Sequence, residues 1–333
     1  MSLVLRAGRD ADAADVIALI GACWAEYPGC VMDVDGEVPE LRALASYYAG
    51  QGGALWVADA GGRVVGMVAT KPLDQGAWEI CKMYAYPEQR GSGLARSLID
   101  TAEDFARGHG ATAMKLWTDT RFDRAHRFYE NCSYVRVGAI RALNDLSNTM
   151  EFGYAKALTG VSVARLDAAA AVSAIARLAV VLKDCVDAGA SVSFHAPLSI
   201  ARARAYWKRV ASEAAMGEKI LFAAWCDGVL VGTVSLGLDM TENQRHRAGV
   251  QKLLVARGAR RRGIARMLLR AAEAAARDDG RALLVLDTVT DGGAEPLYLS
   301  EGWQRLGVIP DYSRDANGTQ EATTFFWKRN VLA

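Results

Sequence analysis

The sequence predicts an α/β fold built from two tandem domains, and three observations carry this prediction. Residues 81–106 read as an apolar strand, a short basic turn with glycine and an amphipathic helix, and residues 251–276 repeat that order. Gly93 of the first copy matches Gly263 of the second, 170 residues later. The chain has 333 residues, of which 51% are hydrophobic, and this is enough for a core in each half. A repeat of this length indicates duplicated domains, because solenoid periods are much shorter.

Apolar periodicity predicts the elements of the first half. Apolar residues three to four positions apart predict helices, and alternating apolar residues between turn residues predict strands. The expected strands cover 3–7, 54–59, 63–70, 78–85, 113–118, 134–140 and 150–156, and the expected helices cover 10–24, 38–48, 94–108 and 123–131.

The second half repeats this order of elements. Its expected strands cover 162–166, 220–226, 229–236, 250–255, 282–287, 304–308 and 323–327, and its expected helices cover 168–187, 200–213, 264–276 and 294–300. Residues 157–160 form the expected linker, which divides the chain into predicted domains 1–157 and 161–333.

Composition excludes several classes of function. The formal net charge is +1, so the chain lacks the basic field that nucleic-acid binding requires. The six cysteines lack CxxC spacing, and the four histidines have no partner at ligand spacing, so reduced thiols and no metal site are expected. No signal peptide and no apolar run of membrane-span length are apparent. A cytoplasmic protein without nucleic-acid or membrane partners is therefore expected.

The two repeated loops are candidate anion sites. Each joins a strand to a helix N-terminus, where backbone N–H groups and the helix dipole attract phosphate. Gly91 and Gly93 are expected to take positive φ or to let a ligand approach closely. Arginines in both loops add charged donors, although a solvated basic turn is the alternative reading. The chain has no GxxxxGK[ST] loop, and its glycines match the dinucleotide fingerprint poorly.

The pattern Arg-x-x-Gly-x-Gly/Ala, which runs from Arg90 to Ala95 and from Arg260 to Ala265, resembles motif A of the GNAT superfamily of N-acetyltransferases. The order of strands and helices is similar to that fold through nearly the whole chain. The resemblance implies two tandem GNAT-like domains, each with a mixed, mostly antiparallel twisted sheet flanked by helices. It also implies acetyl-CoA as cofactor, with its pyrophosphate on the loop and its pantetheine arm along the preceding strand.

The resemblance assigns cofactor contacts to matching positions in the two halves. In the first half these are Met83, Tyr84, Ala85, Gln89, Arg90, Gly91, Ser92, Gly93, Leu94 and Ala95. In the second half they are Leu253, Leu254, Val255, Arg260, Arg261, Arg262, Gly263, Ile264 and Ala265.

Acetyl transfer to an amine needs a base for the ammonium and an acid for the leaving thiolate. In the first half the resemblance offers Glu79 as base and Tyr129 as acid. The alternative for Glu79 is a strand carboxylate paired with a neighbour such as Lys82. The alternative for Tyr129 is a core aromatic, although Phe128 beside it is the more natural core residue.

In the second half the resemblance offers Tyr298 as acid, whereas Gly249 stands where a glutamate would match Glu79. Asp239, Glu242 or His246 could act through water, although each is more typical of a loop. Several stretches of this half, such as LDTVTDGGAEPLY, resemble acetyltransferases of the tabtoxin-resistance type. Enzymes of that type acetylate small molecules that carry an amine.

These observations favour an acetyl-CoA-dependent N-acetyltransferase that acts on a primary amine of a small molecule. The first half has the fuller catalytic set. A protein amine is the alternative acceptor, and one or both halves could instead bind acetyl-CoA without turnover. The duplication could supply a pseudo-dimer within one chain.

Overall fold

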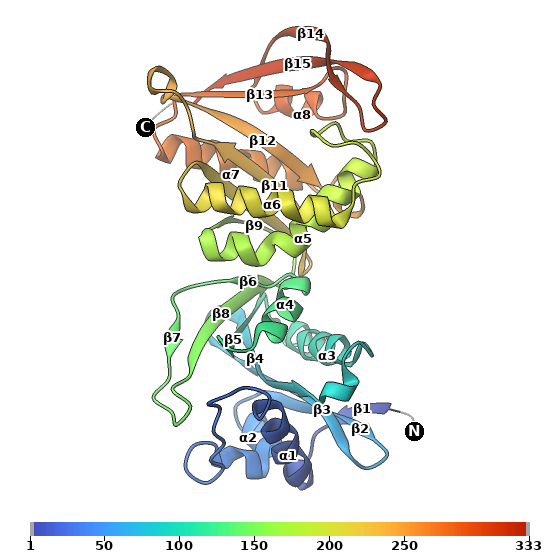
Figure 1. The fold of residues 1–333 in the computed structure, drawn as a ribbon, viewed down its shortest axis with the longest axis vertical. Helices are drawn as coiled ribbons and strands as arrows, with labels where there is room; N and C mark the ends of the chain where they lie inside the picture. The colour runs from blue at the N-terminus through green and yellow to red at the C-terminus, as the bar shows by residue number, and fades with distance from the viewer. Residues whose placement is uncertain (1–2, 331–333) are drawn as a thin grey trace. The chain divides into compact units, whose positions relative to one another are not determined.

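The computed structural model describes residues 3–330, and the chain divides into two compact units (Figure 1). One unit comprises Met1–Tyr129 with Arg136–Thr159, and the other comprises Glu130–Val135 with Gly160–Ala333. Apart from Glu130–Val135, which belong to the second unit, this division follows the two halves of the sequence, and the domain limits 1–157 and 161–333 stay predictions. Within residues 3–330, no helix combines the length and the apolar character that crossing a membrane requires.

The first unit is built around a mixed sheet. Its strand order is β1-β2-β3-β4-β5-β8-β6, with β7 paired to β8, and β4 and β5 are parallel while the neighbouring pairs are antiparallel. The strands are β1 Leu3–Ala7, β2 Ala54–Ala60, β3 Val64–Pro72, β4 Ala77–Ala85, β5 Ala113–Asp119, β6 Val135–Arg136, β7 Arg141–Ala142 and β8 Met150–Ala157. The α-helices are α1 Ala13–Trp24, α2 Leu44–Ala49, α3 Leu94–Gly108 and α4 Asp123–Asn131, and short 3₁₀ turns include η2 Pro39–Ala43 and η4 Pro87–Gln89.

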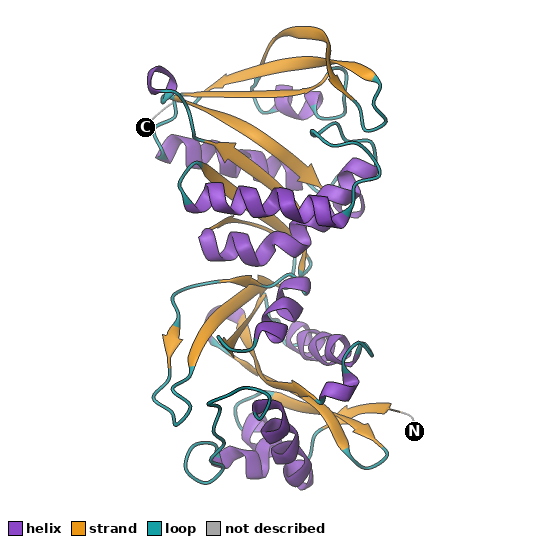
Figure 2. Ribbon diagram, in the orientation of Figure 1, coloured by secondary structure: helices purple, strands orange, loops and turns teal. Residues whose placement is uncertain are grey.

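The second unit repeats the plan with the strand order β14-β15-β13-β12-β11-β10-β9, in which β12 and β13 form the parallel pair. The strands are β9 Val161–Leu166, β10 Lys219–Cys226, β11 Val229–Gly237, β12 Arg247–Val255, β13 Leu283–Val289, β14 Gln304–Arg314 and β15 Gln320–Arg329. The α-helices are α5 Ala168–Asp187, α6 Ile200–Ala215, α7 Ile264–Asp278 and α8 Glu295–Ser300, and the loop before α7 contains the 3₁₀ turn η6 Arg257–Ala259. The predicted mixed sheets flanked by helices are confirmed (Figure 2).

Helices α3 and α7 show why the repeat folds in the same way twice. Five positions of each helix are buried at the same offset, namely Leu94, Leu98, Ile99, Ala102 and Ala106 in α3 and Ile264, Leu268, Leu269, Ala272 and Ala276 in α7. Their spacing of three to four residues forms one apolar stripe that packs on the sheet. In the second unit α7 covers one face of the sheet while α5 and α6 cover the other (Figure 1).

The same two helices each carry a buried glutamate. Lys156 Nζ lies 2.7 Å from a carboxylate oxygen of Glu103, and Lys328 Nζ lies 2.7 Å from one of Glu273. In both units the lysine belongs to the strand beside β5 or β13, so the ion pair ties the helix to the sheet. Burying a carboxylate is costly without such a partner.

Two predicted elements of the first half were wrong in detail. The helix expected over 38–48 is the turn η2 followed by the short helix α2, because the backbone of Ala43 is not helical, with φ −146° and ψ 51°. The strand expected over 134–140 is only the two-residue strand β6, because Gly138 takes a φ of 71° that a strand cannot continue through. The helices over 123–131 and 168–187 match the predicted bounds.

Candidate functional site

The strand before each glycine loop contains a β-bulge. In β4 the partners of Met67 and Ala69 are Tyr84 and Cys81, so Lys82 and Met83 together face one residue of β3. Lys82 takes a φ of 44°, in the left-handed region. The bulge occurs in the second half at the matching residue, where Lys252 takes a φ of 52° and β11 shows the same shift in register. The sequence analysis missed these bulges, although a lysine repeated at the 170-residue offset was a signal for them.

Beyond each bulge the strand has a free edge. The parallel pairing of β4 with β5 ends at Ile80, and that of β12 with β13 ends at Gly249. Among residues 3–330 no strand then covers that side of β4 up to Ala85 or of β12 up to Val255. The two parallel strands therefore separate at the level of the bulge.

Along a strand, the backbone N–H and C=O groups of successive residues point to opposite sides, so one hydrogen bond to β3 shows which residues face the free edge. The N–H of Tyr86 donates to Val65 O of β3 at 3.1 Å, so the polar groups of Ala85 and Met83 point away from β3 toward the open side. In the second half, the N–H of Ala256 donates to Val231 O of β11. By the same alternation, the backbone polar groups of Leu253 and Val255 point away from β11 toward the open side of β12. An extended arm with amide groups could pair with either edge.

Three neighbouring residues of each strand are predicted to contact the pantetheine arm. The middle one, Tyr84 in β4 and Leu254 in β12, differs from the other two because its backbone polar groups point toward the adjacent strand of the sheet. The Tyr84 hydroxyl accepts a hydrogen bond from Trp24 Nε1 at 3.1 Å, and burial raises the pKa of Tyr84 to about 12.

In each unit, a cysteine of the first α-helix contacts the last residue of the free strand edge. Cys23 Sγ donates to Ala85 O at 3.5 Å, and Cys185 Sγ donates to the matching Val255 O at 3.4 Å.

The loop glycines have the predicted positive φ. The φ values are 79° for Gly91, 88° for Gly93 and 77° for Gly263, and no atom of another part of the chain lies within 4 Å of where a Cβ would stand. Arg261 matches Gly91 and takes the same left-handed conformation, with a φ of 64°. The space above both loops is therefore open, which fits a bound pyrophosphate.

Gly93 and Gly263 are also the N-caps of α3 and α7. The first N–H groups of an α-helix have no intrahelical acceptor, and they include those of Leu94, Ala95, Ile264 and Ala265. In the first loop Ser92 Oγ accepts from Leu94 N at 3.2 Å. The second loop has Arg262 in place of Ser92, so its helix start keeps more donors for an anion.

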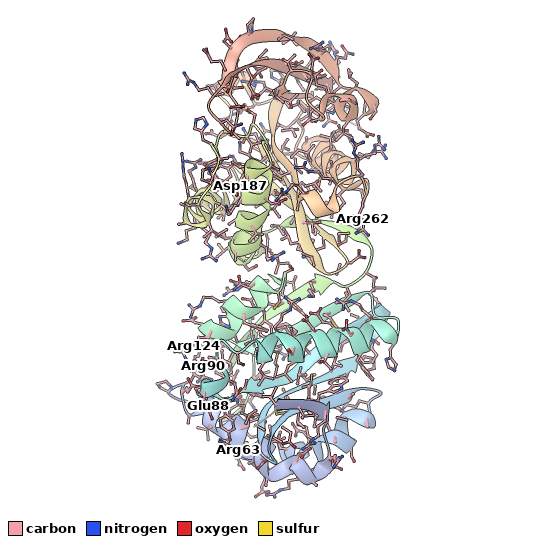
Figure 3. The ribbon with its side chains drawn as sticks, turned by 90° about the vertical axis from the view of Figure 1, so that its right-hand side faces the viewer. Arg63, Glu88, Arg90, Arg124, Asp187 and Arg262 are labelled. Atoms are coloured by element: carbon pink, nitrogen blue, oxygen red, sulfur yellow. The ribbon has the colours of Figure 1, made fainter. Side chains whose placement is uncertain are left out.

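The loop arginines are engaged with other groups in this structure. In the first half, Arg90 Nη2 lies 2.5 and 2.7 Å from the two carboxylate oxygens of Glu26, which follows α1. Arg124 of α4 adds a contact of 3.3 Å to the same carboxylate, and Figure 3 shows the two arginines on one side of the unit. In the second half, Arg260 Nε donates to Val255 O, and Arg262 pairs with Asp227 at 2.9 Å.

Glu79 lies on β4, on the sheet face opposite α3. Its carboxylate is 3.7 Å from Lys71 Nζ of β3, and 19% of its side chain is exposed. The alternative reading, a strand carboxylate paired with a neighbour such as Lys82, is met by Lys71 instead, because Lys82 turns toward Glu40 of η2 and lies 3.3 Å from it. Glu79 is therefore a partly accessible carboxylate close to the bulge.

Tyr129 is buried in the first unit, with 7% of its surface exposed. Its ring lies 6.2 Å from that of Tyr154 and 5.6 Å from that of Phe128. The expectation that Phe128 is the core residue of α4 was wrong, because Phe128 is only partly buried while Tyr129 and His126 face inward.

Tyr298 occupies the matching position on α8 and is 6% exposed. Its ring packs against Trp303 and Phe326, with centroid distances of 6.1 and 5.6 Å. Burial raises the pKa of Tyr298 to about 12, and the negative charge of Asp287 acts in the same direction. A protonated hydroxyl that can donate a proton is therefore present at neutral pH.

Asp287 is a carboxylate that the sequence analysis missed. Gly249 pairs with Val285 in the parallel ladder, and strand alternation puts Asp287 on the same face, two residues further along β13. Its neighbours Leu284 and Leu286 are buried in the core with α7, whereas Asp287 is exposed. The first half has Trp117 at this position. The first unit therefore carries its carboxylate on β4, as Glu79, whereas the second unit has Gly249 there and carries a carboxylate on β13, as Asp287.

The other polar candidates of the second half, Asp239, Glu242 and His246, are all exposed in the connection between β11 and β12. Within the described residues, no group of three or more His, Cys, Asp or Glu side chains is arranged to hold a metal ion.

The family described as the acetyltransferase (GNAT) family matches residues 19–134 and again residues 192–303, which together exceed half of the chain. Among curated proteins, the chain is 28% identical to N-acetyltransferase 8F1 of Rattus norvegicus over 125 residues, which cover 36% of this chain and 54% of that protein. It is 31% identical to N-acetyltransferase 8 of Mus musculus over 98 residues, which cover 28% and 43% of the two chains. The chain thus spans about half the length of these relatives.

Solved structures to which the chain is similar include the ribosomal-protein-alanine N-acetyltransferase of Brucella melitensis, with 20% identity, a match that covers 50% of this chain and 99% of that one, and a TM-score of 0.44. Another is the structure of yncA from Salmonella typhimurium with its cofactor acetyl-CoA, which is 16% identical and covers 52% and 95%, with a TM-score of 0.44. Each of these chains is similar to about half of the present one.

Proposed function

The chain belongs to the GNAT family of acetyltransferases, which use acetyl-CoA, and we propose that it transfers an acetyl group to the primary amine of a small molecule. One observation carries the proposal. Each half combines a bulged strand, a free strand edge and an open glycine loop at a helix N-terminus. This combination fits a long ligand with a diphosphate at one end and amide groups along its length.

The residues that would hold acetyl-CoA follow from this arrangement. Met83 and Ala85 would pair with the pantetheine amides, and Gly93 and Ala95 at the start of α3 would take the pyrophosphate. Leu253, Val255, Gly263 and Ala265 are their counterparts in the second half. Acetyl-CoA supplies an acetyl group that is activated as a thioester.

In the first half, Glu79 would accept the proton of the ammonium, directly or through water. The freed amine nitrogen then attacks the thioester carbon, so that a C–N bond forms and the C–S bond breaks. Tyr129 would give its proton to the leaving sulfur. Backbone N–H groups at the bulge of Lys82 would stabilise the oxyanion.

In the second half, we propose Asp287 as the carboxylate that replaces the missing partner of Gly249, with Tyr298 as acid. Asp287 stands on the same sheet face as Gly249, beside the point where β12 and β13 separate. This assignment takes the place of Asp239, Glu242 and His246 in our interpretation. The narrower resemblance of this half to tabtoxin-resistance acetyltransferases stays a prediction.

The test is release of free CoA from acetyl-CoA by the full chain with a panel of primary amines, peptide N-termini and lysine peptides. Activity in the first half predicts that Glu79→Gln and Tyr129→Phe each lower turnover by about 10²–10⁴-fold. Activity in the second half predicts the same loss for Asp287→Asn and Tyr298→Phe. The double variant Asp287→Asn with Gly249→Glu should then regain activity, because the carboxylate returns at the position of Glu79.

The outcomes separate the alternatives. A preference for peptides over small amines would move the acceptor to a protein. Binding of acetyl-CoA without CoA release from any amine would favour a binding module. If Asp287→Asn and Tyr298→Phe leave turnover intact while the first-half variants abolish it, the second half is not a catalytic site.

A further inference from the structure

Lys252 is the bulge residue of β12, and its partly buried side chain carries the ammonium group to an exposed hydrogen bond. Its Nζ donates to Ser193 Oγ at 3.1 Å and lies 5.8 Å from the centroid of the Tyr206 ring. Ser193 belongs to the connection between α5 and α6, and Tyr206 belongs to α6. Burial of part of the side chain lowers the pKa of Lys252, because desolvation disfavours the charged form of an amine.

Lys252 differs from the other basic side chains around it. Lys219 and Arg209 both contact the carboxylate of Glu213, at 2.9 and 3.5 Å. The matching bulge lysine of the first half, Lys82, pairs with Glu40 at 3.3 Å. Within residues 3–330, no carboxylate lies within 4 Å of Lys252 Nζ. An unpaired, partly buried ammonium group costs free energy unless an anion binds to it.

The position of this charge relates it to the proposed reaction. Lys252 is the bulge residue itself, so its side chain starts where the acetyl group would react. Asp287 provides an opposite charge on the neighbouring strand, and that charge partly offsets the lowering of the Lys252 pKa. A cation and an anion thus stand on the same face of the sheet, at the separation of β12 and β13.

We propose that Lys252, together with Ser193, binds the carboxylate of the acetyl acceptor, and that this acceptor is a small amino acid. The carboxylate would take the charge-assisted bond from Lys252 Nζ, and the amine would lie toward Asp287. The rings of Phe194 and Tyr206, with centroids 5.3 Å apart, would contact the side chain of the amino acid. This inference rests on the proposed acetyl transfer in the second half.

The experiment compares free amino acids with their methyl esters and amides, which keep the amine and lose the carboxylate. CoA release by the full chain is measured with each acceptor for the wild type, for Lys252→Met and for the control Lys208→Met. Lys208 is an exposed lysine on α6, so the control removes one positive charge from the same unit and leaves the bulge of β12 intact. The wild type is expected to favour the amino acids.

Lys252→Met should raise KM for amino acids about ten- to hundredfold, because a charge-assisted bond is lost, and should leave KM for the esters and for acetyl-CoA unchanged. Lys208→Met should change neither. A peptide with a free C-terminal carboxylate, used as acceptor, tests whether that carboxylate can come from a protein rather than from a free amino acid. Equal use of acids and esters by the wild type, or an equal loss for both in Lys252→Met, would overturn the proposal.

A binding readout separates this proposal from the failure of the proposed function. If no acceptor releases CoA, thermal shifts are measured with amino acids in the presence of CoA. Stabilisation of the wild type and of Lys208→Met, but not of Lys252→Met, would support the site without turnover. No stabilisation of the wild type by any amino acid would refute it.

Discussion

Glu26 should compete with acetyl-CoA for Arg90. In this structure the carboxylate of Glu26 contacts Arg90 through both oxygens and also contacts Arg124. A pyrophosphate on the first loop needs the same guanidinium, so binding must displace the carboxylate. Glu26→Gln keeps the size of the side chain and removes its charge, and we expect it to tighten acetyl-CoA binding in the first half.

The size of this effect follows from the exposure of the pair. The Arg90 side chain is 44% exposed and that of Glu26 is 28% exposed, so solvent screens the attraction. Both short contacts come from one nitrogen, which is weaker than a two-nitrogen fork. Such exposed pairs contribute about 0.2–1 kcal/mol, so the dissociation constant should fall by roughly 1.4- to 5-fold.

Isothermal titration with acetyl-CoA at low and physiological salt is the assay, with the change expected in one of two sites if both halves bind. Asp35→Asn is the matched control, because it removes one negative charge from an exposed pair with Arg42 in the same unit. Glu26→Gln should give no gain in an Arg90→Met background. The reasoning fails if Glu26→Gln weakens binding, if the control gives the same gain, or if the gain survives without Arg90.

Three further predictions concern stability. Glu273→Gln should destabilise the protein by about 1.5–3 kcal/mol in urea unfolding, because it removes the counter-charge of Lys328, whose side chain is 21% exposed; a loss below about 1 kcal/mol would contradict this contribution. Tyr298 has a folded pKa of about 12 against about 10 when unfolded, so the unfolded state loses its proton first and stability should fall by ~2–3 kcal/mol between pH 10 and pH 12. Tyr298→Phe should lack that part of the fall, and an identical pH profile would refute the assignment. Gly91→Ala should cost about 1–2 kcal/mol through its positive φ yet still bind acetyl-CoA, because Arg261 already places a side chain in this conformation; loss of binding would show a steric requirement instead.

Much of the fold could be predicted because its signals are local. Apolar periodicity depends on residues a few positions apart, and the repeat at 170 residues supplied each signal twice. The positive φ of Gly91 and Gly93 followed from the turn that a strand-to-helix connection needs. The predicted bounds of elements were wrong where no local signal existed, as at the non-helical backbone of Ala43.

The candidate sites were less accessible to sequence reasoning. Glu79, Tyr129 and Tyr298 were assigned by resemblance, and the lysine beside Glu79 is Lys71, which β3 brings to it across the sheet, rather than Lys82. Asp287 was missed because no spacing along the chain relates it to Gly249. The two lie near each other through the register of parallel strands whose connection includes the whole of α7.

The sequence by itself determined that the chain holds two copies of one domain, where their helices and strands lie, and which loops have backbone suited to phosphate. Only the tertiary structure decided which charged side chains have a partner of opposite charge. It paired Arg90 with Glu26 and Lys82 with Glu40, and it left Lys252 with a hydroxyl and no carboxylate within 4 Å among the described residues. The reason is physical: periodicity is a property of neighbouring residues, whereas ion pairing depends on distances that the sheet register and helix packing set between residues far apart in the chain.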